Sequence, residues 1–289
     1  MKVLVTGAGG QLGADVINEL NKRGYEGIGT DIQDMDITDA DAVLERIGKL
    51  KPDAVVHCAA WTAVDAAEDE VNRVKVHDLN VEGTHNIARA CLATGATMLY
   101  LSTDYVFDGQ GTEPWKPDNK AFAPLNYYGV TKLEGELAVS SLLDKYFIVR
   151  SEWIFGANGN NFIKTMLKAA ENQDEVRVVN DQFGTPTYTC DLSRLLVDMI
   201  ATKKYGCYHA TNEGGYISWY DFCCEIYRQT GIDTKVIPVS TAEYGLLIAT
   251  RPFNSRLDKS KLDEAGFKRL PDWKDALERY LGVTENRPR

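Results

Sequence analysis

The chain has 289 residues, of which 42 are Asp or Glu and 32 are Lys or Arg, so its net charge is −10. A hydrophobic content of 44% and a charged content of 26% are ordinary for a globular protein with one large domain or two coupled ones. The acidic balance argues against nucleic acid or an anionic membrane as a bulk partner, although a small anionic ligand needs only a few local donors.

The first half of the chain alternates short apolar runs with helical patterns. Strands are predicted at residues 2–6, at a run ending with Thr30 and Asp31, and at 54–58, 97–101 and 147–150. Helices are predicted from the loop after residue 10 to about 22, at 39–50, at about 71–93, and from Asn126 onward. This alternation predicts right-handed crossovers and an α/β fold of the Rossmann type, with a doubly wound parallel sheet.

The texture of the sequence changes after about residue 153, where smaller strand and helix pieces follow one another without a low-complexity linker or a repeat. We predict a dinucleotide-binding domain at residues 1–153 and a smaller C-terminal α/β substrate-binding lobe at 154–289. Residues of about 176–203 are expected to return to the first domain. A second lobe at the carboxyl ends of the strands would close the active-site cleft.

A glycine-rich loop follows the first predicted strand and opens the next helix. Gly7, Gly10 and Gly13 stand in the spacing G-x-x-G-x-x-G, which lets backbone amides approach a pyrophosphate at a helix N-terminus. The spacing differs from the G-x-G-x-x-G of long-chain dehydrogenases, since Leu12 takes the place of that pattern's last glycine. Between a strand and a helix, the loop predicts a dinucleotide site rather than an ordinary turn.

Asp31 ends the second predicted strand, 24 residues after Gly7, close to the ~20 expected of an acid that binds the adenosine ribose. A carboxylate there accepts a hydrogen bond from the 2′-hydroxyl and repels a 2′-phosphate. No Lys or Arg occurs from residue 30 to 41 to neutralise such a phosphate. The sequence therefore predicts NADH, with NADPH as the alternative, and Asp36 and Ile37 as a second contact at the adenine edge.

Tyr128 and Lys132 lie four residues apart on a helix that Asn126 can cap. Their side chains share one face, where the ammonium is expected to stabilise the phenolate and to lower the pKa of Tyr128. A tyrosine poised in this way gives a proton to a carbonyl oxygen and takes it back in reverse. Taken alone, the Tyr-x-x-x-Lys pattern is more often part of an amphipathic surface.

Motifs over most of the chain converge on one family. They are the glycine loop, Ala59-Ala60, Asn80 on the long helix, the runs 102–109 (STDYVFDG), 151–156 (SEWIFG), 181–187 (DQFGTPT) and 251–255 (RPFNS), and the Tyr128–Lys132 pair. With these motifs the chain resembles the extended short-chain dehydrogenase/reductase superfamily and, within it, the dTDP-4-dehydrorhamnose reductases. Each motif is weak alone, and the set is specific.

The resemblance implies reduction of the C4 ketone of dTDP-4-dehydro-6-deoxy-L-mannose to dTDP-L-rhamnose, a step of polysaccharide biosynthesis. It implies that Thr103 donates to the ketone oxygen, that Tyr128 supplies the proton, and that Lys132 holds the cofactor ribose. The implied cofactor contacts are Gly7, Gly10, Gln11, Leu12, Gly13, Asp31, Asp36, Ile37, Ala59, Ala60, Trp61, Thr62, Asn80, Tyr128 and Lys132. The implied substrate contacts are Thr103, Asp104, Tyr105, Trp153, which would stack on the sugar, and Arg251, which would pair with the diphosphate.

The residue after Asp104 separates two reactions of the superfamily. Sugar-nucleotide 4,6-dehydratases carry Asp-Glu there, an acid/base pair that removes water, whereas this chain carries Asp104-Tyr105. Dehydration is therefore disfavoured and ketone reduction favoured. Another nucleotide-sugar 4-ketoreductase or epimerase stays open, as does a cofactor-binding regulatory subunit that kept the fold and lost its chemistry.

Several expected absences complete the prediction. The six cysteines form no CxxC pair and the four histidines show no metal spacing; Cys190 stands where some relatives carry a carboxylate thought to help a metal-bridged dimer. We therefore predict no metal, and a monomer or homodimer. With no signal peptide and no membrane-spanning run, the expected location is the cytoplasm. Glu152 stands where relatives often carry Ser or Thr, an exchange that would alter sugar preference.

Overall fold

The computed structural model describes residues 1–245 and 248–285. A six-stranded sheet lies at its centre, with every neighbouring pair parallel, in the order β10-β5-β4-β3-β1-β2. The strands are β1 (Lys2–Thr6), β2 (Glu26–Thr30), β3 (Ala54–His57), β4 (Thr97–Thr103), β5 (Tyr146–Ser151) and β10 (Gly206–His209). The central strand β3 is buried along its whole length, as its continuous apolar run predicts. The predicted Rossmann-type parallel sheet is confirmed.

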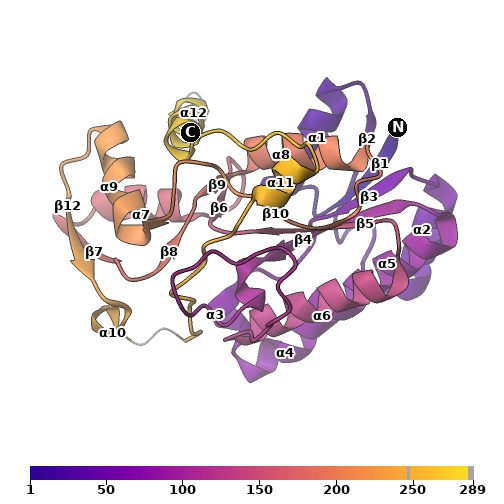
Figure 1. The fold of residues 1–289 in the computed structure, drawn as a ribbon, viewed down its shortest axis with the longest axis horizontal. Coiled ribbons are helices and arrows are strands. Elements are labelled where there is room, and N and C mark those ends of the chain that lie inside the picture. Colours follow the sequence, from indigo (N-terminus) through magenta and orange to yellow (C-terminus); the bar gives the residue numbers. More distant parts are fainter. Residues whose placement is uncertain (246–247, 286–289) are drawn as a thin grey trace.

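Helices cover both faces of this sheet (Figure 1). Helices α1 (Gln11–Lys22) and α8 (Thr189–Ile200) pack on one face in the same core as β1. The other face carries α2 (Ala40–Leu50), α5 (Gly83–Thr94) and α6 (Tyr127–Leu142). Helix α1 turns an apolar stripe to the sheet, formed by Leu12, Val16 and Leu20.

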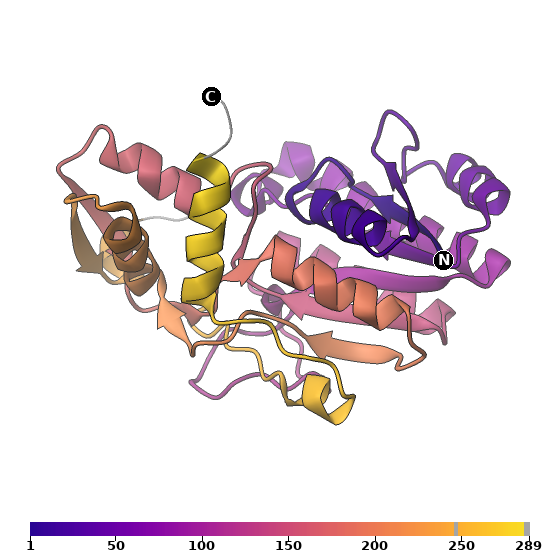
Figure 2. The ribbon, with the colours of Figure 1, turned by 90° about the horizontal axis from the view of Figure 1, so that it is seen from above.

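A smaller lobe follows at one end of the sheet (Figure 2). Its strands are β6 (Ile154–Phe155), β7 (Glu175–Val179), β8 (Phe183–Gly184), β9 (Thr187–Tyr188), β11 (Ile217–Ser218) and β12 (Lys235–Val239), which form three two-stranded pairs. Its longer helices are α7 (Phe162–Ala170), α9 (Trp219–Thr230) and α12 (Trp273–Glu285), which share one apolar core. The short helix α10 (Thr241–Tyr244) belongs to this lobe, whereas α11 (Ser260–Glu264) packs in the core of the large sheet through Leu262.

The division at residue 153 stays a prediction, and the strand pairing differs from it in two details. Strand β10 falls inside the expected lobe, yet it pairs with β5 and forms the edge of the large sheet. Strand β7 falls inside the stretch expected to return, yet it pairs with β12 in the lobe. Only α8 of that stretch packs on the large sheet, because its apolar residues join the core beside α1. Sequence order therefore does not separate the two parts.

The helix predicted at about 71–93 is not one regular helix. It consists of α4 (Glu70–His77), a π-helical turn η1 (Asp78–Glu82) and α5, after the short α3 (Val64–Ala67). Extra residues in a helical turn redirect a side chain, and such turns occur frequently at functional sites. Here the turn carries the buried Asn80.

Candidate active site

A cavity of about 860 Å³ opens at the carboxyl ends of β1, β3, β4 and β5. This is where ligands bind in doubly wound sheets. Most of the predicted site residues line it: Gly7, Gly10, Gln11, Leu12, Gly13, Asp31, Asp36, Ile37, Ala59, Ala60, Thr62, Thr103, Asp104, Tyr105, Tyr128, Lys132 and Trp153. Segments from both parts of the chain thus meet at one site.

The glycine loop between β1 and α1 has no room for side chains. Gly7 has a φ of +67°, and a Cβ on Gly13 would lie 2.1 Å from the Gly7 carbonyl oxygen. The N–H of Gly10 donates to that same carbonyl at 3.0 Å, which folds the loop tightly over the start of α1. The loop thus presents backbone at a helix N-terminus, the arrangement that binds a pyrophosphate. These residues fit a dinucleotide.

Asp31 lies beside this loop, at the end of β2. Its Oδ2 accepts the N–H of Gly9 at 2.9 Å, so the carboxylate is fixed on the cavity wall. Asp36 and Ile37 line the same end of the cavity. This end can therefore receive the adenosine of a dinucleotide, as the sequence predicted.

Asn80 does not line the cavity but holds one of the loops that do. Its Oδ1 accepts the N–H of Trp61 at 2.7 Å, and its Nδ2 donates to the Trp61 carbonyl and to Thr131 Oγ1. Asn80 thereby ties the loop after β3, which lines the cavity, to helix α6. Asn80 and Trp61 are absent from the cavity lining, so a direct contact of either side chain with the cofactor stays a prediction.

Helix α6 brings Tyr128 to the end of β4. The side chain of Asn126 caps the helix by accepting the N–H of Gly129 at 2.8 Å, as predicted. A Cβ on Gly129 would lie 2.4 Å from the carbonyl oxygen of Tyr105, so glycine lets the helix approach the loop after β4 closely. As a result, Thr103 at the end of β4 and Tyr128 near the start of α6 line the same cavity.

The pKa of Tyr128 is not lowered as the sequence predicted. Burial raises it above its ordinary value, the negative charge of Asp104 adds to the rise, and the hydrogen bond with Thr103 acts in the opposite direction. Lys132 does not pair with the phenol: its ammonium donates to the Leu101 carbonyl at 2.8 Å and lies 4.0 Å from the centre of the Tyr100 ring. Burial lowers the pKa of Lys132 to about 7, against the opposing charge of Glu136.

Asp104 is a buried carboxyl at the base of the cavity. Thr103 Oγ1 donates to one of its oxygens at 3.0 Å, and Ser255 Oγ donates to the other at 2.5 Å. Burial raises the pKa of Asp104 to about 6, and these hydrogen bonds limit the rise. The sequence does not mark Ser255 as a partner of Asp104, because no local pattern joins residues 151 positions apart.

Two predicted substrate contacts take different positions. The ring of Trp153 lines the cavity and stacks on Trp219 at 3.7 Å between centroids, with its backbone at a φ of +48°. Arg251 is absent from the lining and pairs with Asp65 at 2.7 Å. Binding of a diphosphate by Arg251 would require that ion pair to open, and it stays a prediction.

The described part of the chain shows neither a cluster of metal ligands nor a helix that could span a membrane. Among residues 1–245 and 248–285, no group of three or more His, Cys, Asp or Glu side chains is arranged to hold a metal ion. The same residues contain no helix that is long and apolar enough to cross a membrane.

Comparison with known proteins agrees with this geometry. The family model described as "RmlD substrate binding domain" matches residues 1–285. The spore coat polysaccharide biosynthesis protein SpsK of Bacillus subtilis (strain 168) is 40% identical over 280 residues, which cover 97% of this chain and 96% of that protein.

Two solved structures share the whole fold. A dTDP-4-dehydrorhamnose reductase of Clostridium acetobutylicum has a TM-score of 0.94 and 43% identity, covering 99% of this chain and 100% of that one. The dTDP-4-dehydrorhamnose reductase of Bacillus anthracis, solved in complex with NADP, has a TM-score of 0.93 and 40% identity, covering 98% of this chain and 100% of that one. With the match of the family model, these likenesses show that the chain belongs to the RmlD substrate binding domain family, the family its motifs predicted.

Proposed function

We propose that the chain reduces the C4 ketone of dTDP-4-dehydro-6-deoxy-L-mannose to give dTDP-L-rhamnose, with a reduced nicotinamide dinucleotide as the hydride donor. The observation that carries this proposal is that Thr103, Tyr128 and Lys132 line the same cavity as the glycine loop. The choice of sugar nucleotide rests on the names of the full-length relatives.

The reaction adds a hydride to C4 and a proton to its oxygen; the cofactor supplies the hydride. Burial and the charge of Asp104 keep Tyr128 protonated at neutral pH, so its hydroxyl has the proton to give. The Thr103 hydroxyl donates to Asp104 in the free protein, and it would turn from Asp104 to donate the second hydrogen bond to the developing oxyanion. Lys132 lines the same cavity and would hold the cofactor ribose.

Dehydration fits this site poorly. A 4,6-dehydratase needs a carboxylate beside the aspartate, and Tyr105 occupies that place. Burial and the charge of Asp104 raise the pKa of Tyr105, so its phenol is a poor base at neutral pH. An epimerase uses the same Tyr and Lys and differs in retaining its cofactor through each turnover.

For the cofactor we propose NADH, with NADPH as the competing candidate. The Asp31 carboxylate, held by Gly9, would bind the ribose 2′-hydroxyl. The bound NADP in the Bacillus anthracis relative favours NADPH for that protein. A cytoplasmic monomer or homodimer that works without a metal completes the proposal.

The test is to mix purified protein with freshly prepared dTDP-4-dehydro-6-deoxy-L-mannose and either NADH or NADPH. Oxidation of either cofactor, matched mole for mole by dTDP-L-rhamnose, is the expected result. Interconversion of sugars without net cofactor oxidation would identify an epimerase. Cofactor binding without any sugar conversion would favour the regulatory subunit.

A further inference from the structure

Glu152 is a buried carboxyl in the cavity that the proposed mechanism does not use. It follows β5 directly, its residue is only 3% exposed, and it lines the cavity beside Trp153. Asp104, at the end of the neighbouring strand β4, lines the cavity too. Two buried carboxyls therefore lie at the sugar end of the site.

One oxygen of Glu152 is bound and the other is not. Oε1 accepts the N–H of Thr185 at 3.0 Å, whereas Oε2 is buried without any hydrogen-bond partner. An unpaired buried polar atom costs on the order of 1–3 kcal/mol, so a hydrogen bond to Oε2 would be stabilising. Oε2 has almost no accessible surface in the free protein, so the carboxyl must turn toward the cavity that Glu152 lines before a ligand can reach it. Asp104 is not in this condition, because each of its oxygens already accepts a hydroxyl.

The surrounding backbone makes room for this carboxyl. A Cβ on Gly184 would lie 2.1 Å from Oε2 and 2.9 Å from Cε2 of Trp153, so only glycine leaves space there. Behind Glu152, the hydroxyl of Thr185 donates to the Gly215 carbonyl at 3.1 Å. Gly184 therefore leaves space for the carboxyl, and Thr185, which binds it, is itself held by Gly215.

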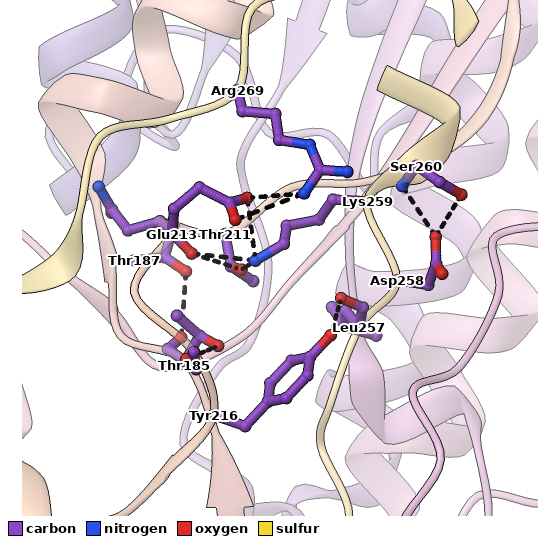
Figure 3. Close-up of polar contacts among 12 residues, drawn as sticks. Thr185, Thr187, Thr211, Glu213, Tyr216, Leu257, Asp258, Lys259, Ser260 and Arg269 are labelled. Carbon is purple, nitrogen blue, oxygen red and sulfur yellow. Dashed lines mark hydrogen bonds and ion pairs between the residues drawn. The ribbon is translucent and has the colours of Figure 1, made fainter. Parts of the chain in front are cut away.

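A polar network surrounds Tyr216, the residue after Gly215 (Figure 3). Tyr216 donates to the Leu257 carbonyl at 3.0 Å, and the buried Lys259 binds Thr211 and pairs with Glu213. Burial and the charge of Asp104 raise the pKa of Glu152, against the Thr185 N–H and the charges of Lys259 and Arg256. A neutral carboxyl both donates and accepts, which suits a hydroxyl partner.

We propose that Glu152 determines sugar specificity, because its unpaired carboxyl oxygen forms a hydrogen bond with a ring hydroxyl of the bound hexose. This proposal rests on the proposed function for the class of ligand, a nucleoside diphosphate sugar. A site that pairs a substrate hydroxyl rejects the analogue lacking it, since the buried polar group is then left unpaired. Glu152 would thus recognise a hydroxyl group of the sugar, while Thr103 and Tyr128 act on its ketone.

The experiment measures the Kd of dTDP-L-rhamnose and of its 2-deoxy and 3-deoxy forms by calorimetry, with the cofactor present. Wild-type protein is compared with Glu152→Gln, which keeps an acceptor for Thr185, and with Glu152→Ala. Glu171→Gln, an exposed carboxylate at the end of α7, is the matched control. Unchanged cofactor binding shows that each variant is folded.

We expect one of the two deoxy sugars to bind wild-type protein and Glu171→Gln at least about 10-fold more weakly than dTDP-L-rhamnose. In Glu152→Ala that ratio should fall to about 1, with Glu152→Gln in between. The same ratio in Glu152→Ala and wild type would overturn the inference. Because binding needs no turnover, a protein that binds these sugars but reduces none would refute the proposed function alone.

Discussion

The two ends of the cavity are built in different ways. The cofactor end comes from loops within the first 62 residues, and it is shaped by glycine backbone and by one fixed carboxylate, Asp31. The sugar end joins residues from the ends of β4 and β5 to the later segments around Gly184 and Ser255. It contains buried carboxyls and phenols whose pKa values are raised.

This difference separates binding from chemistry. Backbone amides bind a phosphate without ionising, so cofactor binding should change little with pH. The sugar end depends on protonation states that burial creates, and one substitution there changes its neighbours. Substitutions at the sugar end are therefore expected to act on turnover and sugar affinity while cofactor affinity stays constant.

Tyr128→Phe gives the strongest test of whether turnover and cofactor binding depend on different ends of the cavity. Loss of the proton donor should lower kcat by about 10²–10⁴-fold, and cofactor binding, measured by fluorescence titration, should not change. Tyr127→Phe is the control on the same helix, because Tyr127 is absent from the cavity lining and its hydroxyl reaches only the Arg73 carbonyl. Equal turnover in the two variants would refute the catalytic assignment.

Lys132→Met should separate activity from stability. We expect a loss of about 10²-fold in kcat, since the variant removes the ammonium that is proposed to hold the cofactor ribose in the cavity. Stability should not fall in parallel, because the wild-type protein buries an amine whose folded pKa, about 7, lies below its ordinary value. The unfolded chain then binds more protons above pH 7, so this group makes wild-type stability rise with pH from about 7 toward 10.

Denaturant unfolding at pH 7 and pH 9.5 tests whether the Lys132 amine makes wild-type stability rise with pH. The free energy of unfolding of Lys132→Met minus that of wild type should be most positive at pH 7 and should shrink at pH 9.5. Comparing the two proteins at each pH cancels the titration of other groups. A difference that grows with pH would show that the Lys132 charge stabilises the fold.

The sequence predicted the cofactor end more completely than the sugar end. Gly7, Gly13 and Asp31 are local signals, because a loop between a strand and a helix has few conformations and its glycines mark them. The strands, the parallel sheet and most helices were predicted for the same reason. The π-helical turn at Asn80 was not, since nothing in a helical pattern marks one extra residue per turn.

The sugar end could be predicted only in part. The resemblance supplied Thr103 and Tyr128, yet the raised pKa of Tyr128 depends on burial and on Asp104, which only the folded chain determines. Ser255 and Gly184 act on the site from far along the chain. Arg251 shows the converse: its motif matched, and in the structure it pairs with Asp65.

Gly184→Ala tests whether the wall of the sugar end is as tight as its geometry indicates. The new Cβ would collide with Glu152 and Trp153, so we expect a loss of about 1–3 kcal/mol in stability and about a 10-fold rise in KM for the sugar. Gly48→Ala in α2, where a Cβ would meet nothing within 4 Å, is the control and should be neutral or stabilising. Thermal melting and steady-state kinetics measure both effects; a KM equal to that of wild type would mean that the wall yields.

The smallest expected effect is at the cofactor end, in Asp31→Asn. The amide keeps an oxygen for the Gly9 N–H but loses the negative charge, so repulsion of a 2′-phosphate falls. The kcat/KM ratio of NADPH to NADH should rise by about 3–10-fold, roughly 1 kcal/mol, while kcat with the better cofactor stays the same. Asp34→Asn, whose carboxylate accepts the Asp31 N–H, is the nearby control. A change in the KM of the sugar, without a change in the NADPH-to-NADH ratio of kcat/KM, would contradict the separation of the two ends. The charge at Asp31 would then act at the sugar end and not at the cofactor end.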